Sequence, residues 1–208
     1  MRFAVLGSGS QGNGTLVAHD DTYVLVDCGF SLRETERRLL RLGVHPAQLS
    51  AILVTHEHAD HVHGVGLLSR RYNLPVYLSR GTLRGMRKPV EPAGLLAGGE
   101  QLQIGDLSIE VIAVAHDAQE PTQYVFSDGE RRFGLLTDLG SYCDKVLYGY
   151  RDLDALMIEA NHCRDMLARG HYPYFLKQRV GGELGHLNNH QAAFLVSELG
   201  WKDLQHLV

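Results

Sequence analysis

Three histidines and an aspartate fall within six positions of this sequence, in the segment Thr-His-Glu-His-Ala-Asp-His at residues 55–61. The segment follows an apolar run at residues 51–54, so a strand that ends at Val54 would present it as a loop at the edge of a sheet. A helix would follow at once, over residues 60–68. Imidazole and carboxylate ligands together suit zinc, manganese or iron better than calcium or magnesium. The alternative is a solvated histidine-rich loop that holds no metal.

The spacing of these side chains indicates two metal ions rather than one. One short loop cannot wrap four ligands around a single tetrahedral ion. We therefore expect His56 and His58 on one ion, and Asp60 and His61 on the other. Paired ions about 3.5–4 Å apart recur in phosphoester and amide hydrolysis, because they generate hydroxide and stabilise the leaving oxygen. The loop thus predicts a hydrolase with two divalent metal ions.

Two more ligand candidates stand at the ends of downstream strands. His116 follows the alternating apolar segment at residues 102–114 and would complete a three-histidine site with the first two histidines of the loop. Asp138 follows the strand expected at residues 131–136, where a carboxylate would bridge the two ions. A structural histidine and a turn-forming aspartate are the alternatives at these positions.

The first forty residues predict a glycine-rich loop, a hairpin and a helix. Four glycines lie in residues 7–14, and this loop is either a flexible turn or a cradle of backbone N–H groups for an anion. The hairpin at residues 15–26 ends at Asp27, a candidate for orienting a ligating imidazole. Ser31 and Glu34 form a capping-box pattern at the start of a helix. The apolar side of that helix is expected to consist of Leu32, Leu39, Leu40 and Leu42.

Composition is that of one ordinary globular domain. With 208 residues, 44% apolar and 21% charged, we expect a single domain over residues 1–208, with no internal repeat or linker. No apolar run is long enough to span a membrane, and three cysteines at unrelated spacings favour reduced thiols in the cytoplasm. The net charge of −4 gives no overall attraction to nucleic acid, so phosphate recognition would have to be local.

The histidine-rich loop after an apolar strand resembles the hallmark of the metallo-β-lactamase fold, with the pattern His-x-His-x-Asp-His at residues 56–61. The resemblance implies an α/β protein with four layers, an αββα sandwich of two mixed sheets between helices. The pattern is specific for the fold but carries little information about the substrate.

Five segments together are similar to one branch of that superfamily, the YycJ/WalJ (VicX)-type proteins. They are residues 6–13, residues 25–31, the histidine-rich loop, residues 158–162 and residues 185–189. The resemblance implies a metal-dependent DNA exonuclease that acts from the 5′ end, with a role in DNA repair. More distantly the same layout resembles ribonuclease Z and the PhnP-like cyclic phosphodiesterases.

The likeness to ribonuclease Z implies a proton-donating pair formed by Glu159 and His186. A histidine held by a carboxylate can protonate a departing alkoxide, whereas a histidine at a helix start is the structural alternative. Catalysis is therefore expected from Asp60, Glu159 and His186. Substrate-binding candidates are Ser10, Gly12, Asn13, Asn161 and His162.

One departure from these families concerns the last metal-binding histidine. They carry it on a strand after the final helix, and residues 204–208 resemble only the beginning of that strand. We expect a truncated strand and a weakened second metal site, unless His206 takes the place of the missing ligand.

Two other functions compete with the DNA exonuclease. A small-molecule hydrolase, acting on a cyclic phosphodiester, a thioester or a lactone, is mildly favoured by the acidic net charge. A metal-binding module without turnover is favoured only by the missing histidine. DNA is the expected substrate rather than RNA, and the oligomeric state, including a homodimer, is left open by the sequence.

Overall fold

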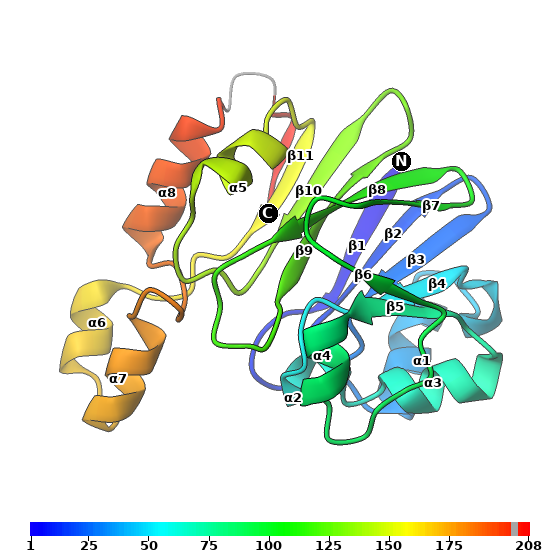
Figure 1. Ribbon diagram of the computed structural model, residues 1–208, viewed down its shortest axis with the longest axis horizontal. Coiled ribbons are helices and arrows are strands. Elements are labelled where there is room, and N and C mark those ends of the chain that lie inside the picture. Colours follow the sequence, from blue (N-terminus) through cyan, green and yellow to red (C-terminus); the bar gives the residue numbers. More distant parts are fainter. Residues whose placement is uncertain (201–203) are drawn as a thin grey trace.

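The computed structural model describes residues 1–200 and 204–208, and two six-stranded sheets packed face to face form its centre (Figure 1). The first sheet consists, in spatial order, of β1 (Arg2–Gly7), β2 (Gly14–His19), β3 (Thr22–Val26), β4 (Ala51–Leu53), β5 (Val76–Ser79) and β6 (Gly94–Leu96). The second consists of β12 (His206–Leu207), β11 (Ala155–Ile158), β10 (Arg132–Leu136), β9 (Thr122–Ser127), β8 (Leu107–Ala113) and β7 (Gln101–Ile104). Both sheets mix parallel and antiparallel pairs.

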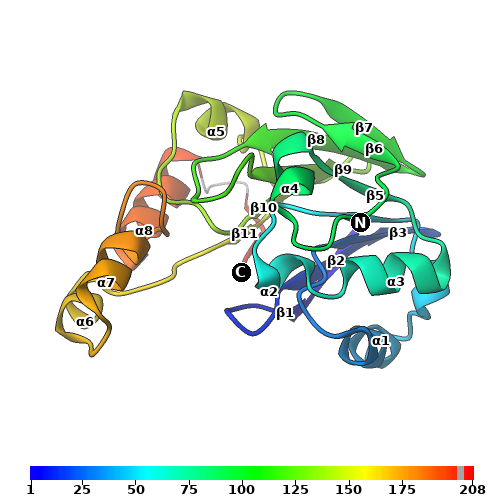
Figure 2. The same cartoon turned by 60° about the horizontal axis from the view of Figure 1, so that its bottom comes forward.

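Helices cover the outer face of each sheet, as Figure 2 shows. The described helices are α1 (Leu32–Arg41), the 3-10 turn η1 (Pro46–Gln48), α2 (Ala59–Val62), α3 (Val65–Tyr72), α4 (Arg80–Gly85), α5 (Asp144–Gly149), α6 (Arg164–Arg169), α7 (Tyr174–Val180) and α8 (Asn189–Glu198). Leu39 of α1 and Leu68 of α3 pack against the first sheet, whereas Val146 of α5 and Leu195 of α8 pack against the second. The predicted four-layer αββα architecture is confirmed.

The main core lies between the sheets because their strands alternate apolar side chains toward each other. Leu107, Ile109 and Val111 of β8 point inward at every second position and are fully buried. They meet Phe126 of β9 and Phe133 of β10, and the ring of Phe133 stacks on Phe3 with centroids 4.2 Å apart. This core holds both sheets as one frame beneath the histidine-rich loop.

The strand directions bring the candidate ligands to one edge. Strand β9 runs antiparallel to both β8 and β10, and β11 runs parallel to β10. The carboxyl ends of β8, β10 and β11 therefore lie at the same edge of the second sheet, and His116, Asp138 and Glu159 follow them. The loop after β4 joins this edge, since the Thr122 N–H donates to the Thr55 carbonyl at 2.9 Å.

Local structure differs from the sequence-based prediction in the helix after the loop. The single helix expected at residues 60–68 is divided into α2 and α3, with Gly64 between them. A Cβ at Gly64 would lie 2.3 Å from the Phe30 carbonyl oxygen, so the chain passes here too close to an earlier segment for any other residue. This contact joins distant parts of the sequence, and helical periodicity does not reveal it.

Helix α1 is confirmed with two corrections. The Ser31 hydroxyl accepts from the Glu34 N–H, but the Glu34 carboxylate pairs with Arg37 and Arg38 rather than returning to the cap. Leu40 and Leu42 are 55% and 46% exposed, so they do not belong to the buried face. The helix turns a narrower stripe toward the sheet than its leucine count suggests.

The carboxyl-terminal strand is present as β12 at the edge of the second sheet. His206 pairs with Ala155 at the start of β11, three residues before the edge that carries Glu159. The structure therefore does not bring His206 to the candidate site. Val208, the last residue, reaches the cavity that Asp60 and Asp138 line.

Two other expectations concern thiols and membranes. Cys28, Cys143 and Cys163 are all free within the described residues, as their spacing predicts. None of the helices that the structure describes has the length and hydropathy of a membrane span.

Candidate metal centre

The loop that carries the histidines is fixed from both sheets. The Asp27 carboxylate accepts from the Thr55 N–H at 2.9 Å and from its hydroxyl at 2.8 Å. From the second sheet, the Tyr124 hydroxyl donates to the Val54 carbonyl at 2.7 Å. Thr55 and His56 are almost fully buried, so this loop is part of the core rather than a solvated turn. The histidine side chains therefore extend from a rigid backbone segment.

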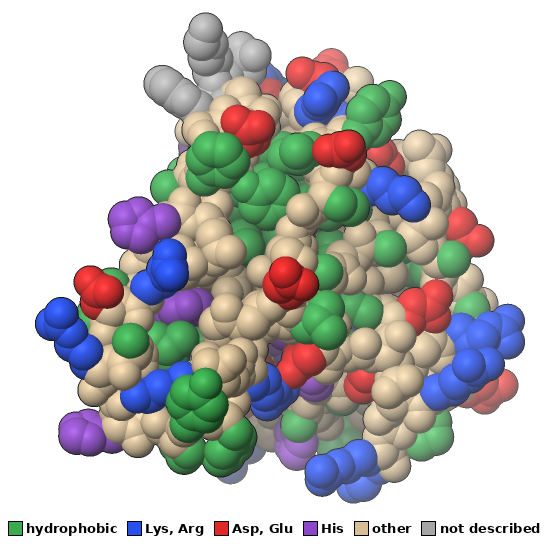
Figure 3. Space-filling view, turned by 60° about the vertical axis from the view of Figure 1, so that its left-hand side comes forward, with side chains coloured by type: hydrophobic (Ala, Val, Ile, Leu, Met, Phe, Trp, Pro, Cys, Tyr) green, Lys and Arg blue, Asp and Glu red, His purple; other side chains and the backbone are tan. Residues whose placement is uncertain are grey.

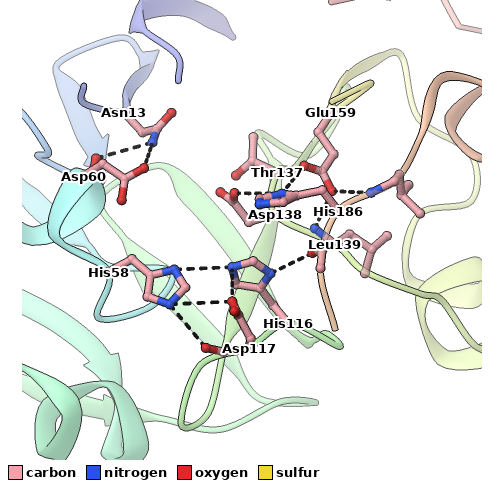
Figure 4. A network of polar contacts seen from close by, with 12 residues as sticks. Asn13, His58, Asp60, His116, Asp117, Thr137, Asp138, Leu139, Glu159 and His186 are labelled. Carbon is pink, nitrogen blue, oxygen red and sulfur yellow. Dashed lines mark hydrogen bonds and ion pairs between the residues drawn. The ribbon is translucent and has the colours of Figure 1, made fainter. Parts of the chain in front are cut away.

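Three imidazoles converge in the first ligand group. Nε2 of His56 lies 2.9 Å from Nδ1 of His58, and Nε2 of His116 lies 3.4 Å from the same Nδ1 atom (Figure 4 shows His58 and His116). The outward nitrogens are held elsewhere, since Nδ1 of His116 lies 3.0 Å from the Gly185 carbonyl oxygen and Nδ1 of His56 lies 2.9 Å from the Thr55 hydroxyl. Three inward nitrogens with their other ring atoms engaged are the arrangement of a tri-histidine metal site.

A second group forms beside the first and shares a histidine with it. His56, His61 and Asp138 bring one ligand atom each within 4.8 Å of one another. Nε2 of His61 lies 3.1 Å from Asp138 and 3.6 Å from Asp60, and its Nδ1 atom lies 2.8 Å from Asp27. The ligands expected from the sequence thus converge in space, with Asp138 reaching from the second sheet.

Charge around His61 fits a bound cation. Burial lowers the pKa of His61, but the charges and hydrogen bonds of Asp27 and Asp138 outweigh burial and raise this pKa to about 10. Burial would raise the pKa of Asp138, yet the neighbouring His61 holds it well below its usual range. Burial and the charge of His61 keep the pKa of His56 well below its ordinary value, so His56 stays a neutral ligand. A divalent zinc, manganese or iron ion bound beside these carboxylates would take the place of the His61 proton and leave that imidazole neutral as a ligand.

Both key aspartates adopt a rare backbone conformation. Asp27 has φ of 60° and Asp138 has φ of 52°, in the left-handed region that aspartate tolerates better than most residues. Asp27 stands directly after β3 and Asp138 is the second residue after β10, and the sharp turn at each position aims the carboxylate at His61. Strained conformations held by surrounding structure cluster at functional sites.

Glu159 and His186 lie together beside Asp138, as Figure 4 shows. Nδ1 of His186 is 2.9 Å from Glu159 and 3.4 Å from Asp138. The other Glu159 oxygen accepts from the Leu139 N–H at 2.6 Å and the Leu187 N–H at 3.0 Å, which fixes the carboxylate. Burial lowers the pKa of His186, but Glu159 and Asp138 raise it above its ordinary value overall. The arrangement can present a protonated Nε2 atom to a bound group.

The expected substrate-binding residues divide into two sets. Ser10 and Asn161 line a cavity of about 530 Å³ together with Asp60, Asp138 and His186. Gly12 faces the Phe30 ring instead, where a Cβ would lie 2.6 Å from it, and His162 pairs with Asn188 through a β-bridge. Gly12 and His162 do not line that cavity.

Asn13 also lines the cavity, but its amide contacts the candidate ligands Asp60 and His61. Its Nδ2 atom donates to Asp60 at 3.1 Å and lies 2.9 Å from Nε2 of His61, while its Oδ1 atom accepts from the Gly9 N–H at 2.8 Å. The glycine-rich loop therefore orients Asp60 through this side chain.

Two residues of the site were missed in the sequence. Asp117 lies 3.2 Å from Nε2 of His116 and 3.6 Å from Nε2 of His58, and its second oxygen accepts from Arg179 of α7. The position of Asp117 directly after a ligand candidate is a signal that could have found it. Arg179 arrives from 62 residues further on, and nothing near it in the sequence indicates the contact.

Comparison with known proteins identifies the family of this chain. The sequence profile described as the β-lactamase superfamily domain matches residues 22–205. The exodeoxyribonuclease YycJ of Bacillus anthracis is 35% identical over 212 residues, which cover 100% of this chain and 80% of YycJ. The chain belongs to the metallo-β-lactamase superfamily. Within it, the chain falls in the YycJ/WalJ family, as its five segments suggest.

A second relative agrees with that family, and a solved structure agrees with the fold. The exodeoxyribonuclease WalJ of Streptococcus pneumoniae is 36% identical over 199 residues, covering 92% of this chain and 74% of WalJ. Among solved structures, the short form of human tRNase Z superposes with a TM-score of 0.72 at 15% identity, over 99% of this chain and 92% of that one. The superfamily and its named hydrolases make this chain a hydrolase, and leave the module without turnover unsupported.

Proposed function

We propose that this superfamily member is a two-metal phosphodiesterase that degrades DNA from its ends. The Glu159 and His186 pair beside Asp138 is the observation that carries this proposal. A thioester releases a thiolate, which leaves without such a pair, whereas a nucleic-acid alkoxide leaves more easily when a held acid protonates it. The full-length likeness to two exodeoxyribonucleases supports DNA as the substrate.

The proposed ligand sets follow the two groups in space. His56, His58 and His116 would hold the first ion, Asp60 and His61 the second, and Asp138 would serve both. When bound, the ions would supply a hydroxide near neutral pH and neutralise the charge of the phosphate. Asp27 orients His61, and Asn13 orients Asp60, so each ligand keeps its direction while the substrate is bound.

The protein's own acid is His186 in this proposal. Its Nδ1 atom is occupied by Glu159, so the Nε2 atom is the one free to donate a proton to the leaving oxygen. The cavity that Ser10, Asn161 and His186 line would receive the scissile phosphate. The 5′-to-3′ direction and a role in DNA repair are further parts of the proposal, and only the resemblance to the YycJ/WalJ family supports them.

A small cyclic phosphodiester is the second candidate substrate. The cavity volume of about 530 Å³ lies within the range of small-molecule sites. The same ligands and the same acid would act on it, so chemistry alone does not separate the two substrates.

The test is cleavage of a substrate panel with added manganese or zinc. The panel holds end-labelled duplex DNA, single-stranded DNA, a 3′-extended transfer RNA and a cyclic ribose phosphate. Stepwise loss of nucleotides from DNA ends supports the proposal, and the position of the label that is lost first reports the direction. Cleavage of the cyclic phosphate alone moves the protein to the second candidate.

Two variants control this experiment. Asp60→Ala should abolish turnover while the far-ultraviolet circular dichroism spectrum stays unchanged, because Asp60 lies at the rim of the site rather than in the core. Asp144→Ala removes an exposed aspartate in α5 and should keep full activity. Full activity of Asp60→Ala would contradict the two-metal scheme.

A further inference from the structure

Exposed aromatic side chains gather on the helical arm formed by α6 and α7, a feature that the proposed chemistry does not use. Tyr172, Tyr174 and Phe175 are 60%, 77% and 73% exposed, within four consecutive positions. In Figures 1 and 2 the arm stands away from both sheets. Figure 3 shows hydrophobic side chains projecting at the lower edge of this face, with Lys and Arg side chains next to them. Large rings exposed together in this way mark a binding surface.

The arm leads directly to the metal centre. A cavity of about 400 Å³ lies between α7 and the candidate ligands, with Leu176, Arg179 and Val180 on one side and His58, Asp60 and His186 on the other. The segment that follows α7 is tied to the site, because the Gly185 carbonyl oxygen lies 3.0 Å from Nδ1 of His116. A chain bound in the metal centre that continues along this cavity reaches α7.

Helical spacing connects the cavity with the rings. Phe175 lies four residues before Arg179, so the two side chains share one face of α7 with about 5–6 Å between their Cβ atoms. Arg179 is held against Asp117 beside the histidines, and its side chain is 57% exposed. Moving away from the candidate histidine ligands, this face therefore presents first the Arg179 guanidinium and then the Phe175 ring.

Charge on the arm is opposite to that of the whole molecule. The two helices of the arm carry four cationic residues, Arg164, Arg169, Lys177 and Arg179. Asp165 is the only acidic residue within α6 and α7. The complete chain carries a net charge of −4. Cationic residues interleaved with exposed rings fit a polyanion whose bases are free to stack.

We propose that the arm is a stacking platform for single-stranded nucleic acid, which holds the nucleotides next to the phosphate in the metal centre. This inference rests on the proposed function and adds a substrate class to it. Bases in a duplex already stack on each other, so exposed rings select unpaired or frayed ends. A two-fold contact between identical copies would bring the same cationic residues face to face, which disfavours a homodimer interface here.

Variants of the two α7 rings test the platform. Tyr174→Ala with Phe175→Ala removes both rings, Tyr174→Leu with Phe175→Leu keeps apolar bulk without a flat face, and Tyr174→Phe with Phe175→Tyr keeps both rings. Tyr148→Ala is the matched control, because Tyr148 of α5 is 76% exposed and lies outside the arm. Binding of a fluorescent single-stranded oligodeoxynucleotide is measured by anisotropy in an Asp60→Ala background, which prevents cleavage of the probe. Hydrolysis of bis(p-nitrophenyl) phosphate is measured with Asp60 intact.

The platform predicts weaker oligonucleotide binding, by roughly tenfold per ring, in both the alanine and the leucine variants. The ring-exchange variant and Tyr148→Ala should bind as the parent does, and hydrolysis of the small diester should be unchanged in all of them. Unchanged oligonucleotide binding in the alanine variant would overturn the platform. So would dissociation of a parent dimer by the alanine variant in sedimentation velocity, since the rings would then be an interface between copies. If the parent cleaves no substrate but binds the oligonucleotide through these rings, the proposed function fails and the platform stands.

Discussion

Asp138 combines most of the chemistry of this site in one side chain. It contacts His61 at 3.1 Å and His186 at 3.4 Å, and so connects the second ligand group with the proposed acid. The sequence predicts Asp138 as a ligand candidate because an aspartate that follows this strand lies at the same sheet edge as the histidine-rich loop. Its left-handed φ of 52°, which aims the carboxylate inward, is visible only in the structure.

The Glu159 and His186 pair predicts a pH dependence. An acid works while it is protonated, so kcat/KM should fall as pH rises through the pKa of His186. Glu159 raises that pKa against burial, so Glu159→Gln should move the alkaline limb of the pH profile to lower pH. The measurement is kcat/KM against pH at saturating metal, with Glu183→Gln, an exposed glutamate outside the pair, as control. An alkaline limb that stays in place in Glu159→Gln would rule out this role.

Helix α8 positions the segment that carries His186. Asn188 caps it by accepting from the His190 and Gln191 N–H groups at 3.0 and 3.1 Å, and Gln191 accepts from the Asn188 N–H at 3.0 Å. Because Asn188 stands two residues after His186, the cap also fixes the direction of the acid.

Removing the cap in Asn188→Ala should lower the free energy of unfolding by about 1 kcal/mol and also reduce kcat. Ser31→Ala removes a similar cap from α1, far along the chain from the acid, and should lower stability without loss of kcat. Urea unfolding and steady-state kinetics measure both quantities. Equal kcat values for Asn188→Ala and Ser31→Ala would show that the α8 cap does not contribute to catalysis.

Elements with local signals were predictable, and elements set by distant contacts were not. The cap at Ser31 and the alternating segment before His116 follow from neighbouring residues, and the structure has both of them. The break at Gly64 depends on the Phe30 carbonyl, and the Asp117 contact depends on Arg179 of α7. No pattern within either segment contains the partner.

The two sheets act as one frame for the site. Their shared core fixes the loop after β4 against the strand ends of the second sheet, through contacts such as the one between the Tyr124 hydroxyl and the Val54 carbonyl at 2.7 Å. The ligands come from both sheets, so their mutual distances depend on how the sheets pack. Family resemblance predicted this layout, whereas composition alone predicted only a globular domain.

Loss of a ring from this core should be costly. Phe126 of β9 is fully buried between the sheets, and Phe126→Ala should lower the free energy of unfolding by about 3–5 kcal/mol through lost burial and a residual cavity. Phe194→Ala on the exposed side of α8, where the ring is 58% exposed, should change it by only about 0.5 kcal/mol. Denaturant unfolding of both variants gives the comparison. A similar loss in the two would contradict a packed core between the sheets.

Metal stoichiometry tests the central claim most directly. Isothermal titration calorimetry, in which manganese or zinc is added to the metal-free protein, counts the ions bound per chain. The proposed ligand sets predict two ions for the parent, one after His58→Ala and one after His61→Ala, because these histidines belong to different groups. A single ion in the parent, or two in both variants, would contradict the two-metal site.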